Sequence, residues 1–193
     1  MQDLLTTWAK AAIVIFHFKE DESSMEKKSL NICVLTISDT RSLQEDTSGA
    51  YLAKALEEDG HRLKQRQIVP DNIYKIREIV SCWIADETVD VVIATGGTGL
   101  TGRDSTPEAL QPLFDKEIIG FGEAFRWLSW EDVGASTIQS RTTAGLANGT
   151  FIFALPGSRG ACRLGWEKLL SPQLSSLTKP CNFVDLIPRL REV

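Results

Sequence analysis

The sequence predicts an α/β protein built as a three-layer α/β/α sandwich with a mostly parallel central sheet. Three stretches are apolar without alternation, as expected of strands that are buried on both faces. They are Asn31–Ile37, residues 89–94 and Thr150–Leu155. Segments with helical spacing of apolar residues lie between them, and strands that alternate with helices are typical of a parallel sheet covered on both faces.

Helices are expected where apolar residues recur at helical spacing or where a capping signal appears. The expected helices are residues 48–58, a helix that begins at Pro70-Asp71, a helix that begins at Pro107 with Thr106 as N-cap, residues 120–130 and residues 160–170. Residues 61–69 are more polar, which predicts a strand near the edge of the sheet. Residues 133–148 fit neither pattern.

The chain length suits one domain, because 193 residues can bury a sizeable core. Residues 1–28 differ from the rest: they end in a charged stretch that contains a second methionine, Met25. We therefore expect a poorly ordered N-terminal extension, or a natural start at Met25, followed by a single domain over residues 29–193.

Composition excludes several function classes. A net charge of −5 argues against non-specific nucleic-acid binding, and no run is long enough to span a membrane. Only two histidines are present, which argues against a histidine-based triad. The four cysteines lack Cys-x-x-Cys spacing, which indicates reduced, mostly buried thiols in a cytoplasmic protein.

The most informative motif is the glycine-rich run from Thr95 to Ala109, which follows a predicted buried strand. Glycines let backbone amides approach an anion, and a helix N-terminus adds partial positive charge. The run also carries Arg103, Asp104 and Glu108. It therefore predicts a phosphate site that has charged groups available for chemistry.

Four polar turns follow predicted strands, and in a parallel sheet these turns share one edge, where ligands bind. The turns are residues 38–41, 70–72, 96–106 and 156–159. Together they offer two helix starts, several hydroxyls and three aspartates. This set suits a phosphorylated or nucleotide substrate with a divalent cation, because carboxylates hold Mg²⁺ and backbone amides hold phosphate.

Each motif also has a simpler interpretation. The Gly97-x-Gly99-x-x-Gly102 string matches a dinucleotide fingerprint, but no strand ending in an acid follows about twenty residues later. A P-loop is disfavoured because no Gly-Lys-Ser/Thr follows. Asp71 fits a helix N-cap, and Ser105 with Glu108 fits a capping box.

Three other features fit purely structural roles. Asp39 and Arg41 fit a solvated turn pair, and Pro156-Gly157 fits a simple turn. Four aromatic residues fit the core or a subunit interface better than a ring-stacking site: Phe121, Phe125, Trp127 and Trp130. The presence of several such turns at strand ends is what favours a functional site.

The chain resembles the MoaB and MogA family of molybdenum cofactor biosynthesis proteins, with finer features closer to the MoaB branch. The resemblance covers residues 31–183. It is carried by Thr36-Ile37-Ser38-Asp39, Asp46-Thr47-Ser48-Gly49, the glycine-rich run through Ala109, Gly120-Phe121-Gly122-Glu123, Ser140-Arg141 and Leu155-Pro156-Gly157-Ser158. Ser81-x-Trp83-Ile84 and Pro180-Cys181-Asn182-Phe183 point to the MoaB branch.

The resemblance implies a homotrimer or homohexamer that transfers an adenylyl group from Mg-ATP to the terminal phosphate of molybdopterin. Other proteins of the same pathway are possible partners. The alternative is a catalytically silent molybdopterin-binding or assembly protein. The family's two catalytic carboxylates carry over to Asp71 and Asp104, which we also expect to hold Mg²⁺. Arg103 is kept as well, which favours a working enzyme.

The remaining expected site residues would bind the nucleotide or the pterin. They are Thr36, Ser38, Asp39, Asp46, Ser48, Gly96, Gly97, Thr98, Gly99, Arg103, Thr106, Glu108, Ser140, Pro156, Gly157 and Ser158.

Overall fold

The computed structural model describes residues 27–192, so the expected extension over residues 1–28 lies almost wholly outside the described residues. Six strands form one sheet in the order β2-β1-β3-β6-β5-β4. The parallel strands are β2 (Arg62–Val69), β1 (Asn31–Ile37), β3 (Val91–Thr95) and β6 (Thr150–Leu155). Two further strands complete the sheet: β5 (Thr143–Ala147) pairs antiparallel with β6, and β4 (Lys116–Glu117) pairs antiparallel with β5.

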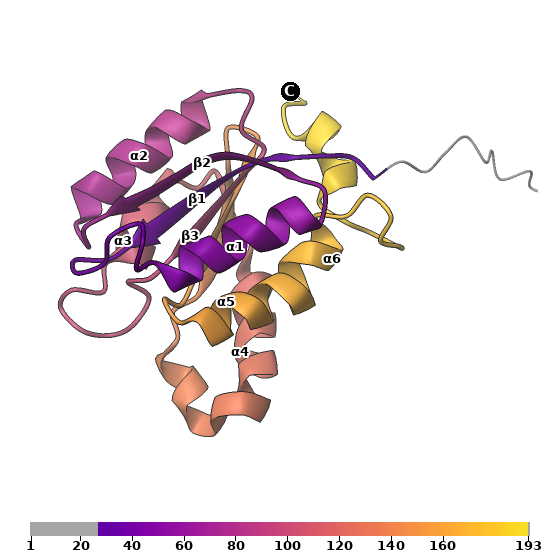
Figure 1. The fold of residues 1–193 in the computed structure, drawn as a ribbon. Helices are drawn as coiled ribbons and strands as arrows, with labels where there is room; N and C mark the ends of the chain where they lie inside the picture. The colour runs from indigo at the N-terminus through magenta and orange to yellow at the C-terminus, as the bar shows by residue number, and fades with distance from the viewer. Residues whose placement is uncertain (1–26, 193) are drawn as a thin grey trace, which may run out of the picture.

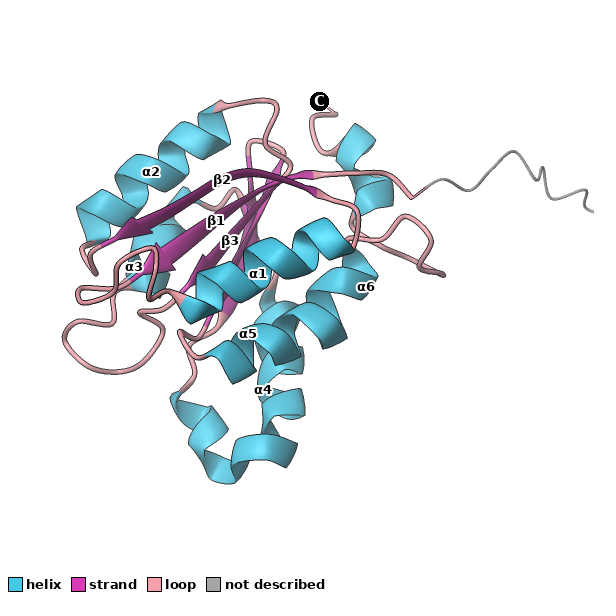
Figure 2. Cartoon of the chain, in the orientation of Figure 1, coloured by secondary structure: helices cyan, strands magenta, loops and turns pink. Residues whose placement is uncertain are grey.

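Helices cover both faces of the sheet, which confirms the predicted three-layer sandwich (Figures 1 and 2). One face carries α2 (Ile73–Ala85) and α3 (Thr106–Leu110). The other carries α1 (Thr47–Glu58), α4 (Ile119–Val133), α5 (Arg159–Gly165) and α6 (Ser171–Gln173). The described chain therefore has one hydrophobic cluster on each side of the sheet.

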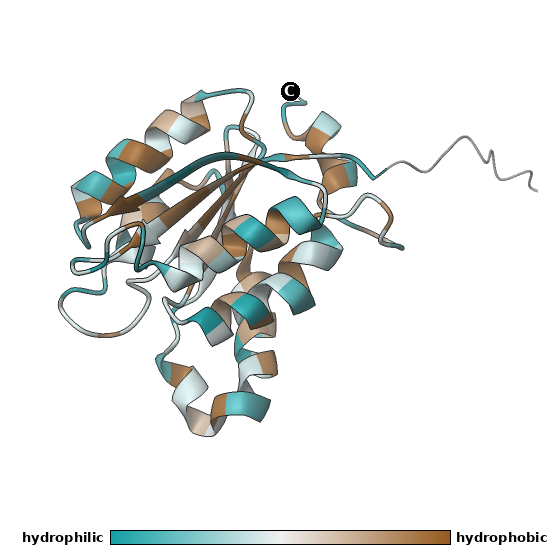
Figure 3. Cartoon of the chain, viewed as in Figure 1, coloured by the Kyte–Doolittle hydropathy of each residue, from teal (hydrophilic) through white to brown (hydrophobic). Residues whose placement is uncertain are grey.

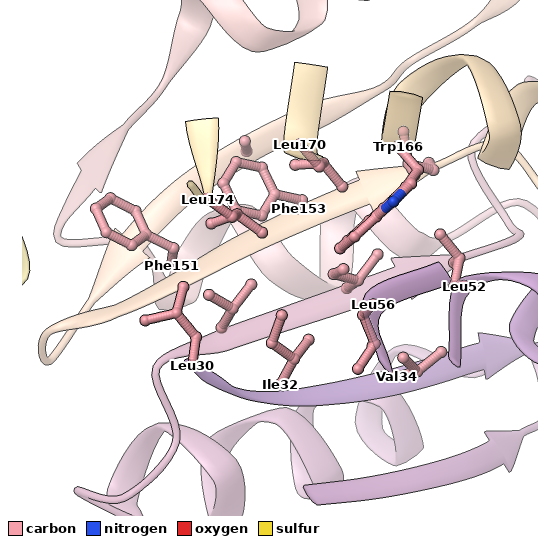
Figure 4. Close-up of a cluster of buried hydrophobic side chains, with 14 of the residues drawn as sticks. Leu30, Ile32, Val34, Leu52, Leu56, Phe151, Phe153, Trp166, Leu170 and Leu174 are labelled. Atoms are coloured by element: carbon pink, nitrogen blue, oxygen red, sulfur yellow. The ribbon is translucent and has the colours of Figure 1, made fainter. Parts of the chain in front are cut away.

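Alternate residues of β1 supply the two clusters, because successive side chains of a strand point to opposite faces. Ile32 and Val34 pack with α1, α4 and α5, whereas Cys33 and Leu35 pack with α2 and α3. Figure 4 shows part of the first cluster, where Leu52, Leu56 and Trp166 of the helical layer face Phe151 and Phe153 of β6. Burial on both faces explains why this strand is apolar throughout.

The edge strand β2 was predicted correctly from its polarity. Only Val69, its last residue, is buried, and the strand is hydrophilic along most of its length (Figure 3). The undecided segment, residues 133–148, forms the 3₁₀-helix η2 (Gly134–Gln139) and then β5. The helix expected over residues 160–170 is α-helical only to Gly165 and continues as the π-helical turn η3 (Trp166–Leu170).

Two helix starts differ from the prediction. α2 begins at Ile73 and not at Pro70-Asp71, because the side chain of Asn72 accepts hydrogen bonds from the amides of Tyr74 and Lys75. This capping position is one residue later than expected and frees the Asp71 carboxylate for another contact. α3 includes Thr106 as its first residue, with Ser105 at the N-cap position, so Thr106 is not the cap.

The cysteines and the large aromatic side chains differ in how far they are buried. All four cysteines are free thiols. Cys33 and Cys162 are buried, as predicted. Cys82 and Cys181 are exposed, so the prediction of mostly buried thiols was wrong for these two. Phe121 and Phe125 lie in the core, but Trp127 and Trp130 are exposed. Within residues 27–192 the helices are too short or too polar to cross a bilayer.

Candidate functional site

The order of the parallel strands creates a crevice between β1 and β3, because the chain continues from β1 to one side of the sheet and from β3 to the other. The loops that leave β1, β3 and β6 gather at this edge, and Figure 2 shows the ends of β1 and β3 there. They enclose an open cavity of about 610 Å³, which we term the central cavity. Its lining residues are Ile37, Ser38, Thr40, Arg41, Gly96, Gly97, Thr98, Gly99, Asp104, Gln139, Ser140, Pro156, Gly157 and Ser158.

Close backbone approach shapes the floor of the central cavity. Gly96 has φ +105°, and a Cβ there would collide with the carbonyl oxygen of Ile37. A Cβ on Gly157 would lie 3.1 Å from the Cα of Gly96. Glycine is therefore required where the turns after β1, β3 and β6 touch.

Asp71 lies beside the glycine-rich turn rather than at a helix cap. Its Oδ1 accepts a hydrogen bond from the Ser105 amide at 3.0 Å and another from the Ser105 hydroxyl. Its Oδ2 occupies the space that a Cβ on Gly97 would need. The capping-box interpretation of Ser105 is wrong as well, because its hydroxyl binds Asp71 and makes no cap hydrogen bond.

Asp104, which belongs to the glycine-rich turn, is also held by hydrogen bonds to its carboxylate. Its Oδ2 accepts hydrogen bonds from the amide and the hydroxyl of Thr101, at 2.8 and 2.6 Å. A Cβ on Gly99 would lie 2.7 Å from this oxygen. The Thr101 hydroxyl lowers the pKa of Asp104 despite partial burial, so the carboxylate is ionised at neutral pH.

An ion pair joins the turns after β1 and β3. Arg103 contacts Asp39 at 2.6 Å, and Oδ1 of Asp39 also accepts a hydrogen bond from the Asp71 amide. The hydrogen bond from Arg103 lowers the pKa of Asp39. Asp39 therefore pairs with Arg103 and not with Arg41, which corrects the turn-pair interpretation.

Three predicted binding residues, Thr36, Asp46 and Ser48, do not line the central cavity and bind other protein groups. Asp46 is buried, accepts hydrogen bonds from Thr36 and Gly49, and pairs with Arg66 at 2.8 Å. Burial opposes ionisation of Asp46, but the hydrogen bond from Arg66 leaves its pKa lowered. The Ser48 hydroxyl donates to the Gly157 carbonyl at 2.9 Å, so α1 supports the turn after β6.

Two further predicted residues face other protein groups. Buried Thr106 donates its hydroxyl proton to the Gly96 carbonyl at 2.8 Å. Glu108 pairs with Arg141 outside the central cavity. Both contacts hold the glycine-rich turn in place, and neither side chain lines the cavity.

Sequence reasoning missed several residues of the site. Thr40, Arg41 and Gln139 line the central cavity, and Arg41 is the one Lys or Arg among the described lining residues. The predicted turn over residues 38–41 contained Arg41, but Arg41 was interpreted there as the partner of Asp39 and not as a binding residue. Ser105, Thr101 and Arg141 were also missed as site residues. The contacts of Ser105 and Arg141 are long-range and leave no pattern in the sequence, whereas Thr101 contacts Asp104 only three residues away.

The donor set of the site consists of carboxylates and hydroxyls. No cluster of three or more His, Cys, Asp or Glu side chains that could hold a metal occurs in residues 27–192. Asp71 and Asp104 each keep one carboxylate oxygen that is not bound to Ser105 or Thr101. Two carboxylates suit Mg²⁺ when substrate phosphates supply further ligands.

Comparison with known proteins identifies the family. The family model described as "Probable molybdopterin binding domain" matches residues 33–176. The chain belongs to this family. Molybdenum cofactor biosynthesis protein B of Escherichia coli strain K12 is 55% identical over 152 residues, which cover 79% of this chain and 89% of that protein.

Solved structures of similar sequence share the fold. A crystal structure of a molybdenum cofactor biosynthesis protein B has a TM-score of 0.74 at 44% identity, covering 76% of this chain and 92% of that one. The tungsten cofactor synthesizing protein MoaB from Pyrococcus furiosus has a TM-score of 0.67 at 39% identity. The match covers 75% of this chain and 92% of that one. The predicted family is therefore confirmed.

Proposed function

We propose that the protein is a molybdopterin adenylyltransferase of molybdenum cofactor biosynthesis. It would transfer the adenylyl group of Mg-ATP to the terminal phosphate of molybdopterin and release pyrophosphate. The observation that carries the proposal is that Asp104 lines the central cavity while Asp71, which follows β2, binds Ser105 of the same glycine-rich turn. The family's function in cofactor biosynthesis supports the choice of substrate.

The reaction needs positioning more than proton transfer. A phosphate oxygen of molybdopterin attacks the α-phosphorus of ATP, and the bond to the bridging oxygen breaks with its electron pair leaving on pyrophosphate. A phosphate monoester is already anionic at neutral pH, so no strong base is required. The site must bring two anions together and stabilise the charge that forms on the leaving group.

Residues of the central cavity match these requirements. Backbone amides of the glycine-rich turn can face phosphate oxygens, and Arg41 supplies positive charge at the same cavity. Ser38, Ser140 and Ser158 line it and can donate hydrogen bonds to the pterin substrate. Asp71 and Asp104 would hold Mg²⁺, which when bound neutralises charge on the phosphates.

A turnover assay tests the proposal directly. Wild-type protein, incubated with molybdopterin, ATP and Mg²⁺, should form adenylyl-molybdopterin and an equal amount of pyrophosphate. Asp104→Ala should abolish turnover and largely spare molybdopterin binding. Gly102→Ala is the matched control on the same turn, because a Cβ at that position meets nothing within 4 Å. Absence of product together with tight molybdopterin binding would favour a silent pterin-binding protein.

We also propose that the protein is a homotrimer or homohexamer. Five exposed apolar side chains gather on α4 and η2, and we term them the α4 patch. They are Ile119, Trp127, Trp130, Val133 and Ile138. Trp127 and Ile138 are each 74% exposed, and large exposed apolar side chains grouped in this way are typical of subunit interfaces.

A cytoplasmic location completes the proposal. The four cysteines are free, and unpaired thiols suit a reducing compartment. Burial raises the pKa values of Cys33 and Cys162 to about 11, so these thiols are unreactive at neutral pH.

A further inference from the structure

Arg141 donates three hydrogen bonds to backbone carbonyls of the glycine-rich turn. Its backbone amide donates to the Thr98 carbonyl at 3.0 Å. Its Nε donates to the Gly99 carbonyl and its Nη2 to the Asp104 carbonyl, each at 2.7 Å. The side chain therefore bridges the two ends of the turn that carries Asp104.

Residues 100–103 of the turn bury no apolar side chain. Leu100 is 68% exposed, and Thr101, Gly102 and Arg103 are exposed as well. A segment without buried apolar contacts opens easily unless hydrogen bonds hold its ends. The guanidinium of Arg141 suits this role because its donors are arranged in a rigid plane, and charged donors form the stronger hydrogen bonds.

Glu108 holds Arg141 in the bridging orientation. Its carboxylate accepts a hydrogen bond from Nη1 of Arg141, on the side away from the two carbonyls. Burial alone would raise the pKa of Glu108, but the contact with Arg141 leaves it lowered. Glu108 is therefore charged at neutral pH and pairs with the guanidinium.

We propose that Arg141 is a positioning residue that keeps the turn Thr98–Asp104 closed, so that the Asp104 carboxylate stays beside the central cavity. Its effect on turnover rests on the proposed adenylyl transfer. Its effect on the turn does not, because the hydrogen bonds belong to the protein alone. Arg141 acts through Asp104 and does not itself contact the reacting atoms.

Arg141→Met tests the proposal, because methionine keeps much of the aliphatic stem and removes every side-chain donor. Arg77→Met is the matched control. Arg77 also donates to two backbone carbonyls, those of Ala109 at 3.1 Å and Glu108 at 2.8 Å, but it supports α3 and not the turn. Amide hydrogen exchange over residues 98–105 reports on the turn without any substrate.

We expect Arg141→Met to speed exchange at Thr101 and Asp104 at least tenfold, and Arg77→Met to leave both amides unchanged. In an active enzyme, Arg141→Met should also lower turnover about 10- to 100-fold and raise the Mg²⁺ concentration for half-maximal rate. Molybdopterin affinity should change less than twofold. If Arg141→Met does not fold, Arg141→Lys replaces it, since lysine keeps the charge beside Glu108 and loses the planar fork.

Unchanged exchange in a folded Arg141 variant, or equal acceleration in Arg77→Met, would overturn the proposal. Weaker molybdopterin or ATP binding with normal exchange would instead assign Arg141 to direct substrate contact and overturn it as well. If wild-type protein shows no turnover, the adenylyl-transfer proposal fails, while the exchange experiment still decides the role of Arg141.

Discussion

Oδ1 of Asp71 accepts hydrogen bonds from both the amide and the hydroxyl of Ser105, a residue 34 positions later in the chain. This contact ties the end of β2 to the glycine-rich turn after β3. It also sets which carboxylate oxygen of Asp71 is available to a ligand. Ser105 therefore controls the orientation of a carboxylate that we assign to the reaction.

The Ser105 hydroxyl can be removed selectively. Ser105→Ala should lower turnover about 10- to 100-fold, as loss of a group that orients a metal-binding carboxylate does. The free energy of unfolding should fall by only about 1 kcal/mol, because the amide hydrogen bond to Asp71 remains. Kinetics with varied Mg²⁺ and thermal unfolding measure the two effects. Ser105→Thr keeps the hydroxyl and should retain most activity; equal losses in both variants would contradict the assignment.

Gly97 should tolerate no side chain. Its φ of +63° strains any L-residue, and a Cβ would collide with Oδ2 of Asp71 and Oγ1 of Thr106. Gly97→Ala should therefore destabilise the fold by about 1–3 kcal/mol and displace Asp71. Chemical denaturation and the turnover assay measure these effects.

Gly102→Ala is the control for the Gly97 experiment, because it adds the same methyl group to the same turn in open space. It should leave stability within about 0.5 kcal/mol of wild type. A Gly97→Ala variant as stable and active as Gly102→Ala would show that the close packing against Asp71 is not required.

Arg41 should contribute affinity for phosphate groups. Its Nη1 makes one long hydrogen bond, 3.3 Å to the Gly157 carbonyl, so the guanidinium can turn toward an anion. Arg41→Ala should weaken binding of ATP or inorganic pyrophosphate about tenfold, which corresponds to about 1.4 kcal/mol. Isothermal titration at two salt concentrations measures the loss. Arg159→Ala serves as control, because Arg159 adjoins Ser158 but does not line the central cavity; equal losses would indicate a general charge effect.

Strands β1, β3 and β6 could be predicted because burial on both faces leaves a clear composition. Every residue of β6 is buried, and its predicted bounds, Thr150–Leu155, are the observed ones. β5 escaped prediction because its sequence, Thr-Ala-Gly-Leu-Ala, is short and mixed. Its burial comes from neighbours: a Cβ on Gly145, for example, would strike the ring of Phe114.

The sequence predicted which turns form the site, but it did not predict the hydrogen bonds between their side chains. The turns that carry Asp71 and Asp104 were predicted because they follow strands that end at one edge, whereas the choice of these two carboxylates came from the family resemblance. The partners of these carboxylates, Ser105 and Thr101, could not be assigned, because either hydroxyl also suits a local capping role. Asp46 was predicted to bind substrate because it belongs to a recognisable motif, yet its buried carboxylate pairs with Arg66.

Buried His61 should make stability depend on pH. Burial lowers its pKa to about 4, and its neutral Nδ1 accepts a hydrogen bond from the Leu30 amide at 3.3 Å. In the unfolded chain the histidine pKa is ~6.5, so as pH falls the unfolded chain binds a proton at His61 before the folded chain does. Stability from this residue is therefore fully present above about pH 6.5 and is lost toward pH 4, by up to about 3 kcal/mol.

His61→Asn isolates that contribution, because asparagine keeps a hydrogen-bond acceptor and does not titrate. Denaturant unfolding between pH 4 and pH 7 should show a shallower loss of stability in the variant than in wild type. Parallel curves for the two proteins would show that His61 does not bind a proton on unfolding in this range.

The α4 patch should govern subunit association. Trp130 is 55% exposed and Trp127 is 74% exposed, and burying two such rings would contribute strongly to an interface. Light scattering should give wild type three or six times the chain mass of 21.4 kDa. Trp127→Glu with Trp130→Glu should give monomers, because a charge at an apolar interface is costly to bury. Tyr74→Glu is the control, since Tyr74 is 76% exposed on α2, across the sheet. A monomeric wild type, or dissociation caused equally by Tyr74→Glu, would exclude the α4 patch as the interface.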